Sequence, residues 1–218
     1  LGWTPVNVDH TDTTSAAWGG NLVAHKLYQK PNGDLAVTIP HTLESQMETS
    51  SYTVTKNSQW GNVTNTQSGT HSYRLVSPAS YDMANVIFDP VMSERYQISA
   101  TVNFTSSNRD FGFMIGACDG WNDLFSLRFV PGENRFSFDK TKRPDIDSST
   151  VADNDVPINL QTGVDYSVRI LLENSMVVVY INDEVALSSR IYRAPGTNWG
   201  VFADHSDVTF SNIEVTTP

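Results

Sequence analysis

Short runs of apolar and β-branched residues recur along the whole chain, and clusters of Gly, Pro, Asn and Asp separate them. No window places apolar residues at i, i+3, i+4 and i+7 over several turns, which is the pattern of an amphipathic helix. Many short strands with regular turn signals are typical of two packed sheets. The sequence therefore predicts an all-β fold, a two-sheet antiparallel β-sandwich of the jelly-roll, concanavalin-like kind.

The expected strands are short, and most are bounded by turn residues. They cover 22–29, 35–39, 73–76, 86–88, 96–104, 111–117, 124–130, 135–139, 166–172, 177–181, 185–191, 200–203 and 208–215. Aromatic residues alternate along several of them, so we expect these rings to pack in the core: Tyr28, Tyr166, Tyr180, Phe113, Phe129, Phe136 and Phe138.

The charge balance restricts the partners that this chain can have. The 218 residues carry 24 Asp and Glu against 14 Lys and Arg, a formal net charge of −10. Nucleic-acid backbones and anionic membranes attract clustered Lys and Arg, so we expect neither as a partner. No apolar stretch is long enough to span a bilayer. The single cysteine, Cys118, allows no intrachain disulfide and no cysteine-based metal site.

Two regions differ from the predicted strands in their residue composition and pattern. We expect residues 1–45 to form an N-terminal extended segment that packs on a sandwich of residues 46–218. Residues 141–157 form a long polar loop, and such a loop in a compact domain is either functional or disordered. No charged-then-apolar leader opens the sequence, so we expect that a leader was removed or that the chain is an excised module.

Three segments in the second half of the chain carry a family resemblance, in the order 135–143 (RFSFDKTKR), 177–192 (VVVYINDEVALSSRIY) and 200–203 (GVFA). Together they resemble the C-terminal β-sandwich of family 32 glycoside hydrolases and the related family 66 fructan-binding modules. Residues 18–35 resemble the seam between catalytic propeller and sandwich in those enzymes. Val178 departs from the pattern, because the family carries Glu at that position.

The catalytic motifs of that family are missing from this chain. Trp121-Asn122-Asp123 is followed by Leu124 rather than Pro, Phe88 stands before Asp89-Pro90, and Ala117 precedes Cys118 where the family has Glu. Glycoside hydrolysis needs two carboxyl groups that flank one bond, and no motif here selects such a pair. We therefore expect no enzymatic activity from this chain alone.

The resemblance implies a non-catalytic module that binds the terminal fructose of a fructan such as levan or inulin. It also implies a secreted or cell-surface location. The alternative is a structural sandwich that braces a family 32 catalytic propeller. That alternative predicts an exposed apolar patch near Trp18, Leu22 and Leu27. A third reading, a hydrolase with an unrecognised site, has the least support.

Several residues could form the sugar site. Asp119, Trp121 and Asp123 fall in a loop between two predicted strands, and Arg128 follows on the next strand. Such a site needs an aromatic wall and a few polar groups for the hydroxyls. Further candidates are Arg143, from the family-like run, and Trp199, as a second stacking platform.

Other charged groups have alternative interpretations. Arg109-Asp110 is expected to be a surface ion pair rather than a clamp for hydroxyls. Lys140, Lys142 and Arg143 could contact a sugar or form a solvated loop. No cofactor is expected. Structural calcium at Asp204 and Asp207 is the one option left open, although two carboxylates are far from a full calcium shell.

Overall fold

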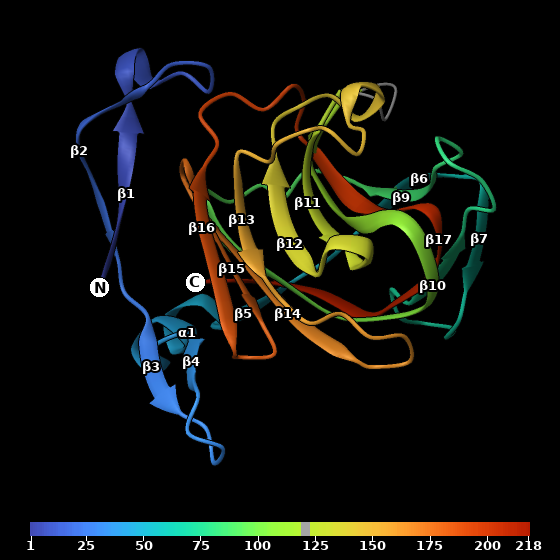
Figure 1. Ribbon diagram of the computed structural model, residues 1–218, viewed down its shortest axis with the longest axis horizontal. Coiled ribbons are helices and arrows are strands. Elements are labelled where there is room, and N and C mark those ends of the chain that lie inside the picture. The colour runs from blue at the N-terminus through green and yellow to red at the C-terminus, as the bar shows by residue number, and fades with distance from the viewer. Residues whose placement is uncertain (119–122) are drawn as a thin grey trace.

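The computed structural model describes residues 1–118 and 123–218, which form a curved β-sandwich with an N-terminal segment at its side (Figure 1). Every strand pair within these residues is antiparallel, and the large core lies between two sheets. The predicted all-β, two-sheet antiparallel sandwich is confirmed. Within the described ranges, no helix is long and apolar enough to cross a membrane.

Two long strands, β10 (Arg95–Ala117) and β17 (Asn198–Thr217), pair with each other and pass through both sheets. Their pairing shifts register near residues 104–110, where both strands bend from one sheet into the other (Figure 1). Extra residues of this kind bend a strand without ending its ladder. The sequence predicts two strands in place of each, because the polar residues around the bend interrupt the apolar alternation.

The first sheet uses the N-terminal half of β10 and the C-terminal half of β17. On one side it continues through β14, β15 and β16, and on the other through β8, β7 and β5. The bounds are Tyr166–Glu173 for β14, Met176–Ile181 for β15, Val185–Arg190 for β16, Tyr73–Val76 for β8, Asn62–Asn65 for β7 and Ser50–Tyr52 for β5.

The second sheet uses the other halves of the two long strands. It runs β13-β12-β11-β10-β17-β9-β6. The bounds are Asn154–Pro157 for β13, Arg135–Asp139 for β12, Phe125–Val130 for β11, Ala84–Phe88 for β9 and Lys56–Trp60 for β6. Strands β5, β6, β7 and β13 were not predicted, because their short polar sequences lack apolar alternation.

The core between the sheets is rich in phenylalanine. Phe113 packs edge-on against Phe210 at a centroid distance of 5.6 Å, and Phe111 stacks on Phe129 at 5.3 Å. Six of the seven aromatic residues expected to be buried are buried, but Tyr28 is exposed. Tyr28 lies in a hairpin outside the sandwich, so its alternation marks a strand without a covering layer.

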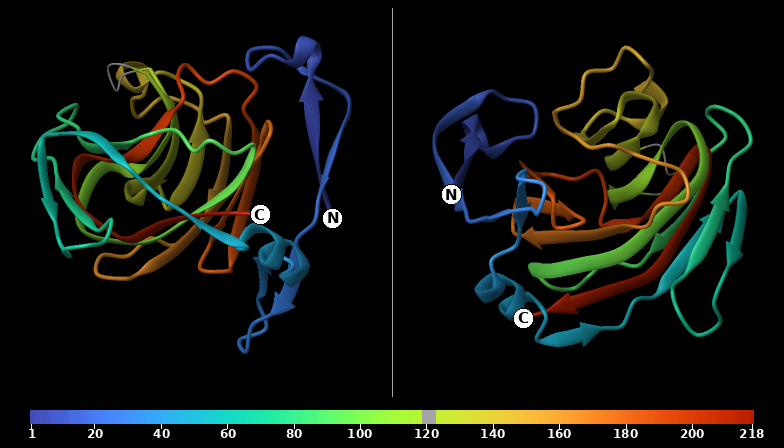
Figure 2. Two further views of the ribbon diagram at one scale, coloured as in Figure 1. Left: turned by 180° about the vertical axis from the view of Figure 1, so that it is seen from behind. Right: turned by 60° about the horizontal axis from the view of Figure 1, so that its bottom comes forward.

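The N-terminal segment forms two hairpins and the helix α1 (His41–Met47) beside the first sheet (Figure 2). The first hairpin is β1 (Gly2–Asn7) with β2 (Ala16–Val23), and the second is β3 (Lys26–Gln29) with β4 (Leu35–Thr38). The predicted strand 22–29 is thus divided at residues 24–25. Helix α1 was not predicted, because seven residues are too few to show helical periodicity.

Short 3₁₀ turns complete the described elements: η1 (Val8–His10), η2 (Pro131–Glu133) and η3 (Arg143–Asp145). The last of them belongs to residues 140–153, which we call the strap. This segment follows β12 and lies over the outer face of the second sheet, where Arg143 and Ile146 are buried. The polar loop predicted at 141–157 is therefore anchored to the sheet through Arg143 and Ile146, while most of its other residues are exposed.

Candidate functional site

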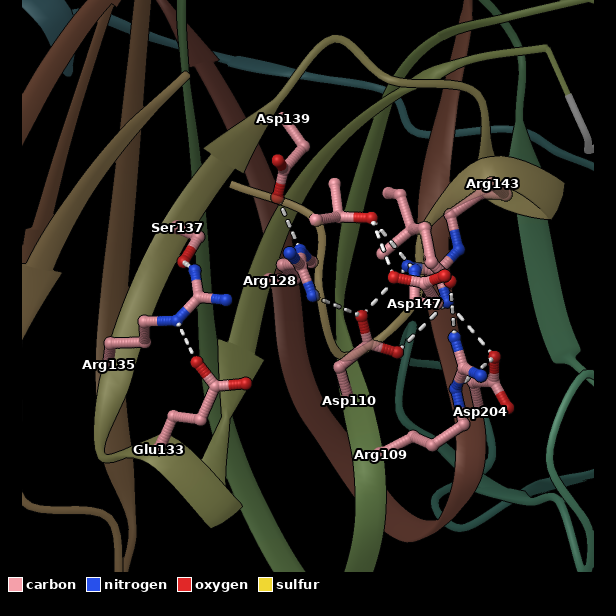
Figure 3. A network of polar contacts seen from close by, with 12 residues as sticks. Arg109, Asp110, Arg128, Glu133, Arg135, Ser137, Asp139, Arg143, Asp147 and Asp204 are labelled. Carbon is pink, nitrogen blue, oxygen red and sulfur yellow. Dashed lines mark hydrogen bonds and ion pairs between the residues drawn. The ribbon is translucent and has the colours of Figure 1, made fainter. Parts of the chain in front are cut away.

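The outer face of the second sheet carries charged side chains in strands that are buried on both faces. Asp110, Arg128 and Asp139 alternate with core residues such as Phe111 and Phe129. Because successive side chains of a strand point to opposite faces, these polar groups lie on the face away from the core. The strap covers them, so a network of ions is enclosed beneath it (Figure 3).

Asp110 is the centre of this network. Arg143 of the strap donates from Nη1 to Asp110 Oδ2 at 2.8 Å and from Nη2 to Oδ1 at 2.9 Å. Arg128 Nη1 donates to Asp110 Oδ2 at 3.1 Å and Arg128 Nε donates to Asp139. The bidentate contact of Arg143 is the strong geometry for a guanidinium with a carboxylate. It fixes the strap to the sheet.

A second carboxylate, Asp204, extends the network towards one end of the sandwich. It accepts a hydrogen bond from Arg143 Nη2 at 3.1 Å and one from the Tyr81 backbone N–H at 2.9 Å. Arg109 Nε lies 3.2 Å from Asp204 Oδ2, and Arg109 Nη2 donates to the Ile146 carbonyl at 2.7 Å. Arg109 therefore holds the strap at a second point.

The three carboxyl groups differ in their electrostatic environment. Burial alone raises the pKa of Asp110, but the charges and hydrogen bonds of Arg143, with the charges of Arg128 and Arg109, outweigh it and lower the pKa. Burial raises the pKa of Asp139 despite Arg128. Burial and the neighbouring charge of Asp110 raise the pKa of Asp204. Asp110 is thus the ion that the arginines stabilise most.

Some buried polar atoms of this face have no hydrogen-bond partner among the described residues. They include Arg128 Nη2, Asp139 Oδ1 and Ser126 Oγ. Ser126 lies two residues before Arg128 on β11 and directly opposite Asp139 on β12. A donor, an acceptor and a hydroxyl on adjoining strand positions are thus without hydrogen-bond partners among the described residues. Such a set could hydrogen-bond the hydroxyl groups of a small molecule or ordered water.

The structure brings some of the predicted site residues together. Arg128 and Arg143 share Asp110, and both are buried. Asp123 lies at the surface, where Lys142 Nζ is 3.4 Å from its Oδ2. Trp199 is only 2% exposed, and its ring lies 4.5 Å from that of Phe88 in the core. Such an indole ring has no open face for a sugar. Asp119 and Trp121 lie outside the described residues.

One expectation about charged residues needs correction. The expected surface pair Arg109-Asp110 is wrong, because Asp110 is 2% exposed and pairs with Arg143 and Arg128 instead. Asp204 pairs with arginines, and Asp207 pairs with Arg74 at 2.6 Å, so both candidate calcium ligands already have cationic partners. Over residues 1–118 and 123–218 no group of three metal-ligating side chains occurs.

Lys140 was expected to contact a sugar or to lie in a solvated loop. Its Nζ lies 3.0 Å from Asp12 Oδ1, so it links the strap to the N-terminal segment.

Sequence reasoning missed the acidic half of the network: Asp110, Asp139 and Asp204. A signal for part of it was present, because Ser126, Arg128, Ser137 and Asp139 alternate with apolar residues in strands that are otherwise hydrophobic. Polar groups at such positions need partners when both faces of a sheet are covered. The identity of these partners depends on strand order, which the alternation does not give.

A second candidate surface lies on the β1–β2 hairpin. Trp18 is 96% exposed, Leu22 is 73% exposed, and Trp3 is exposed as well. The rings of Trp3 and Trp18 lie 6.4 Å apart, so they form one aromatic patch. Leu27 and Leu35 of the next hairpin are also exposed. Trp18, Leu22 and Leu27, where a bracing domain should expose apolar surface, are each exposed.

Comparison with known proteins identifies the class of the sandwich. Residues 43–217 match the family model of the C-terminal domain of glycosyl hydrolases family 32, so the chain belongs to this family. A search of curated proteins finds no match.

Solved structures share the fold. A carbohydrate-binding module, CBM66 from Bacillus subtilis, aligns with a TM-score of 0.58 at 9% identity, covering 75% of this chain and 95% of that one. A fructosyltransferase from A. japonicus aligns with a TM-score of 0.58 at 17% identity, covering 100% of this chain and 34% of the enzyme. A β-fructofuranosidase from Aspergillus kawachii gives 0.57 at 16% identity, with 98% and 35% covered. This chain thus spans about a third of the length of these two enzymes.

Replacement of Arg143 by Met should destabilise the protein, because it leaves Asp204 and Asp110 buried with fewer cationic partners. Removal of one member of a buried ion pair typically costs about 3–5 kcal/mol. Urea unfolding at pH 7 would measure the change. Lys142→Met is the matched control, because the neighbouring ammonium group is exposed and its removal should cost less than about 1 kcal/mol. Equal stability of the two variants would contradict a central role for Arg143.

The lowered pKa of Asp110 should contribute to acid sensitivity. A carboxyl whose folded pKa lies below its ordinary value of 3.8 stabilises the fold above that value, and the contribution is lost as the pH falls further. Asp139 and Asp204 act in the opposite direction, so the test compares variants. The free energy of unfolding of Asp110→Asn should fall less between pH 6 and pH 3 than that of wild type. Parallel pH profiles would show that Asp110 is not the group responsible.

Proposed function

We propose that this chain is the accessory sandwich of a carbohydrate-active enzyme and that residues 1–42 fasten it to an adjoining catalytic domain. The observation that carries the proposal is the exposed aromatic and aliphatic patch on the β1–β2 hairpin. Exposed apolar patches of this kind mark interaction surfaces.

The hairpin has the geometry of an incomplete sheet. Strands β1 and β2 pair with each other, and no further strand in the described chain pairs with either. A two-stranded hairpin is marginally stable alone in water, and three or more strands or a packed partner are normally needed. An adjoining domain could supply both a neighbouring strand and a cover for Trp3 and Trp18.

The sandwich holds the hairpin at defined points. Arg190 of β16 donates to the Pro5 carbonyl at 2.7 Å and to the Thr4 carbonyl at 3.1 Å. The Asn7 N–H donates to the Tyr192 hydroxyl at 2.7 Å. Asp12 accepts hydrogen bonds from the backbone N–H groups of Tyr192 and Arg193. These contacts would present the aromatic patch in a fixed orientation, which favours docking because less conformational entropy is lost.

The extent of the matches supports the same division of the chain. The family model of the sandwich begins at residue 43, whereas the fructosyltransferase structure covers the whole of this chain. We infer that residues 1–42 correspond to a part of that enzyme that precedes its sandwich. By this analogy the adjoining domain would act on fructose-containing saccharides, outside the cell or at its surface.

The hairpin patch can be tested on the full chain by its binding of the dye 1-anilinonaphthalene-8-sulfonate. Trp3→Ser with Trp18→Ser should lower the fluorescence of the bound dye at least twofold and leave the melting temperature within about 2 °C, because neither ring is part of the core. Trp60→Ser is the control, since Trp60 is exposed on β6, away from the hairpin. An equal loss of fluorescence in the control variant would argue against a localised docking patch.

A second candidate function is the recognition of terminal fructose in levan or inulin at the outer face of the second sheet. The observation that favours it is the set of unpartnered atoms Arg128 Nη2, Asp139 Oδ1 and Ser126 Oγ, which are buried, so that a sugar would reach them only if the strap lifts. A guanidinium donor beside a carboxylate acceptor matches the hydroxyl groups of a sugar. Asp123, Arg143, Asp119 and Trp121 would complete this site.

Isothermal titration with levan and inulin tests this second function. Arg128→Lys keeps the charge but removes the planar fork, so binding should weaken at least tenfold. Arg135→Lys on the neighbouring strand β12 is the control and should bind as wild type does. Flat titrations of the wild-type chain with both fructans would remove the sugar site and leave docking as the function.

A further inference from the structure

A cleft of about 470 Å³ separates the N-terminal segment from the outer face of the first sheet. Its walls are residues 21–24, helix α1 and the turn between β14 and β15. It is on the opposite sheet from the buried ion network. We propose that this cleft binds a short neutral oligosaccharide, as a site separate from the outer face of the second sheet. Its volume falls within the range of small-molecule sites, about 300–1,000 Å³.

Part of the cleft lining is apolar. Leu171, Met176 and Val178 contribute from β14 and β15, and Leu43 and Met47 contribute from α1. A sugar ring has a face of C–H groups that loses little by leaving water, and aliphatic side chains can pack against it. The flexible thioether of a methionine also adapts to irregular shapes. The cleft thus offers two apolar walls to a flat, ring-shaped ligand.

The charged side chains around the cleft already have an ion-pair or hydrogen-bond partner within the protein. Arg95 pairs with Glu173. Arg190 donates to Ser175 Oγ at 2.8 Å and to the side chain of Asn21, in addition to the two hairpin carbonyls. Most N–H groups of Arg190 are therefore already used by protein acceptors, so a ligand would find its hydrogen-bond partners among the neutral groups of the cleft.

Neutral hydrogen-bonding groups stand beside the apolar walls. Gln46 and Asn174 bring side-chain amides, and each amide both donates and accepts. The hydroxyl of Tyr180 lies 2.9 Å from His25 Nδ1, at the base of the N-terminal segment. Amide and phenol groups beside aliphatic side chains suit a molecule that carries hydroxyl groups and also has an apolar face. This combination favours a sugar over a purely aliphatic ligand.

Because residues 21–24 form one wall and the sandwich forms the other, a ligand in the cleft would bridge the two parts of the chain. A ligand that binds only the folded arrangement stabilises it by a free energy that grows with the logarithm of the ligand concentration once this exceeds the Kd. Occupation of the cleft should therefore hold the N-terminal segment more firmly against the first sheet.

Isothermal titration of the full chain with the neutral trisaccharides 1-kestose and maltotriose tests the proposal. Saturable one-to-one binding of at least one trisaccharide is expected. Val178→Phe places a ring in the cleft from a strand position that tolerates aromatic residues, and it should weaken binding at least tenfold. Trp60→Ala, on a remote surface, should bind as wild type does.

Two further variants distinguish the possible outcomes. Gln46→Ala changes an exposed helical residue, so folding should be unaffected while affinity falls about three- to tenfold through the lost hydrogen bonds. Any 1-kestose binding that Arg128→Lys removes belongs to the other candidate sugar site, because only that site is proposed to recognise terminal fructose. Absence of saturable binding, or full affinity in both Val178→Phe and Gln46→Ala, would overturn the cleft proposal without affecting the docking patch.

Discussion

The antiparallel ladder between β10 and β17 is the constraint on which the rest of the sandwich depends. It begins at Gln97 paired with Thr216 and continues through the bend to Ala117 paired with Asn198. Each other strand of the two sheets adds to one side of this pair or to a strand already attached to it. The two sheets are therefore covalently continuous through both long strands, and the position of the bend sets which residues face the core and which face outward.

The bend also explains the position of the ion network. Asp110 and Asp204 are paired across the ladder where both strands enter the second sheet. Two carboxylates at adjacent positions repel each other, and burial raises the cost of keeping both ionised. Arg143 contacts both carboxylates, and Arg109 and Arg128 each contact one of them. The strap thus supplies, through Arg143, a positive charge that the two buried carboxylates of the sheet require.

Local sequence pattern predicted the fold class and most of the central strands, because alternation and turn chemistry are local properties. It could not predict that the strands around Phe104 and Phe111 are one strand, since continuity across the bend depends on pairing with β17. For the site, Arg128 and Arg143 were identified by their chemistry. Their partner Asp110 was assigned to the surface, because its burial arises from a strap more than thirty residues away.

Trp199 illustrates the same limit for aromatic residues. A tryptophan beside a strand can face solvent or the core, and the sequence at 198–203 is compatible with both. The Cα pairing of Trp199 with Phe88 of β9 places its ring among other aromatic rings. The residues proposed for sugar binding therefore stay predictions that depend on titration, whereas the membership of the sandwich family follows from the comparison itself.

Arg190 and Tyr192 contact the backbone of β1, but the open edge of β2 has a consequence for the chain when it is kept apart from any other domain. Unpaired backbone N–H and C=O groups along a strand edge accept any strand of suitable length, including the same hairpin of another molecule. Pairing of two such edges joins two copies. Natural edge strands often carry lysine or proline to prevent this, but β2 contains neither. A concentrated solution of the isolated chain is thus expected to self-associate through β2, which a covering domain would suppress.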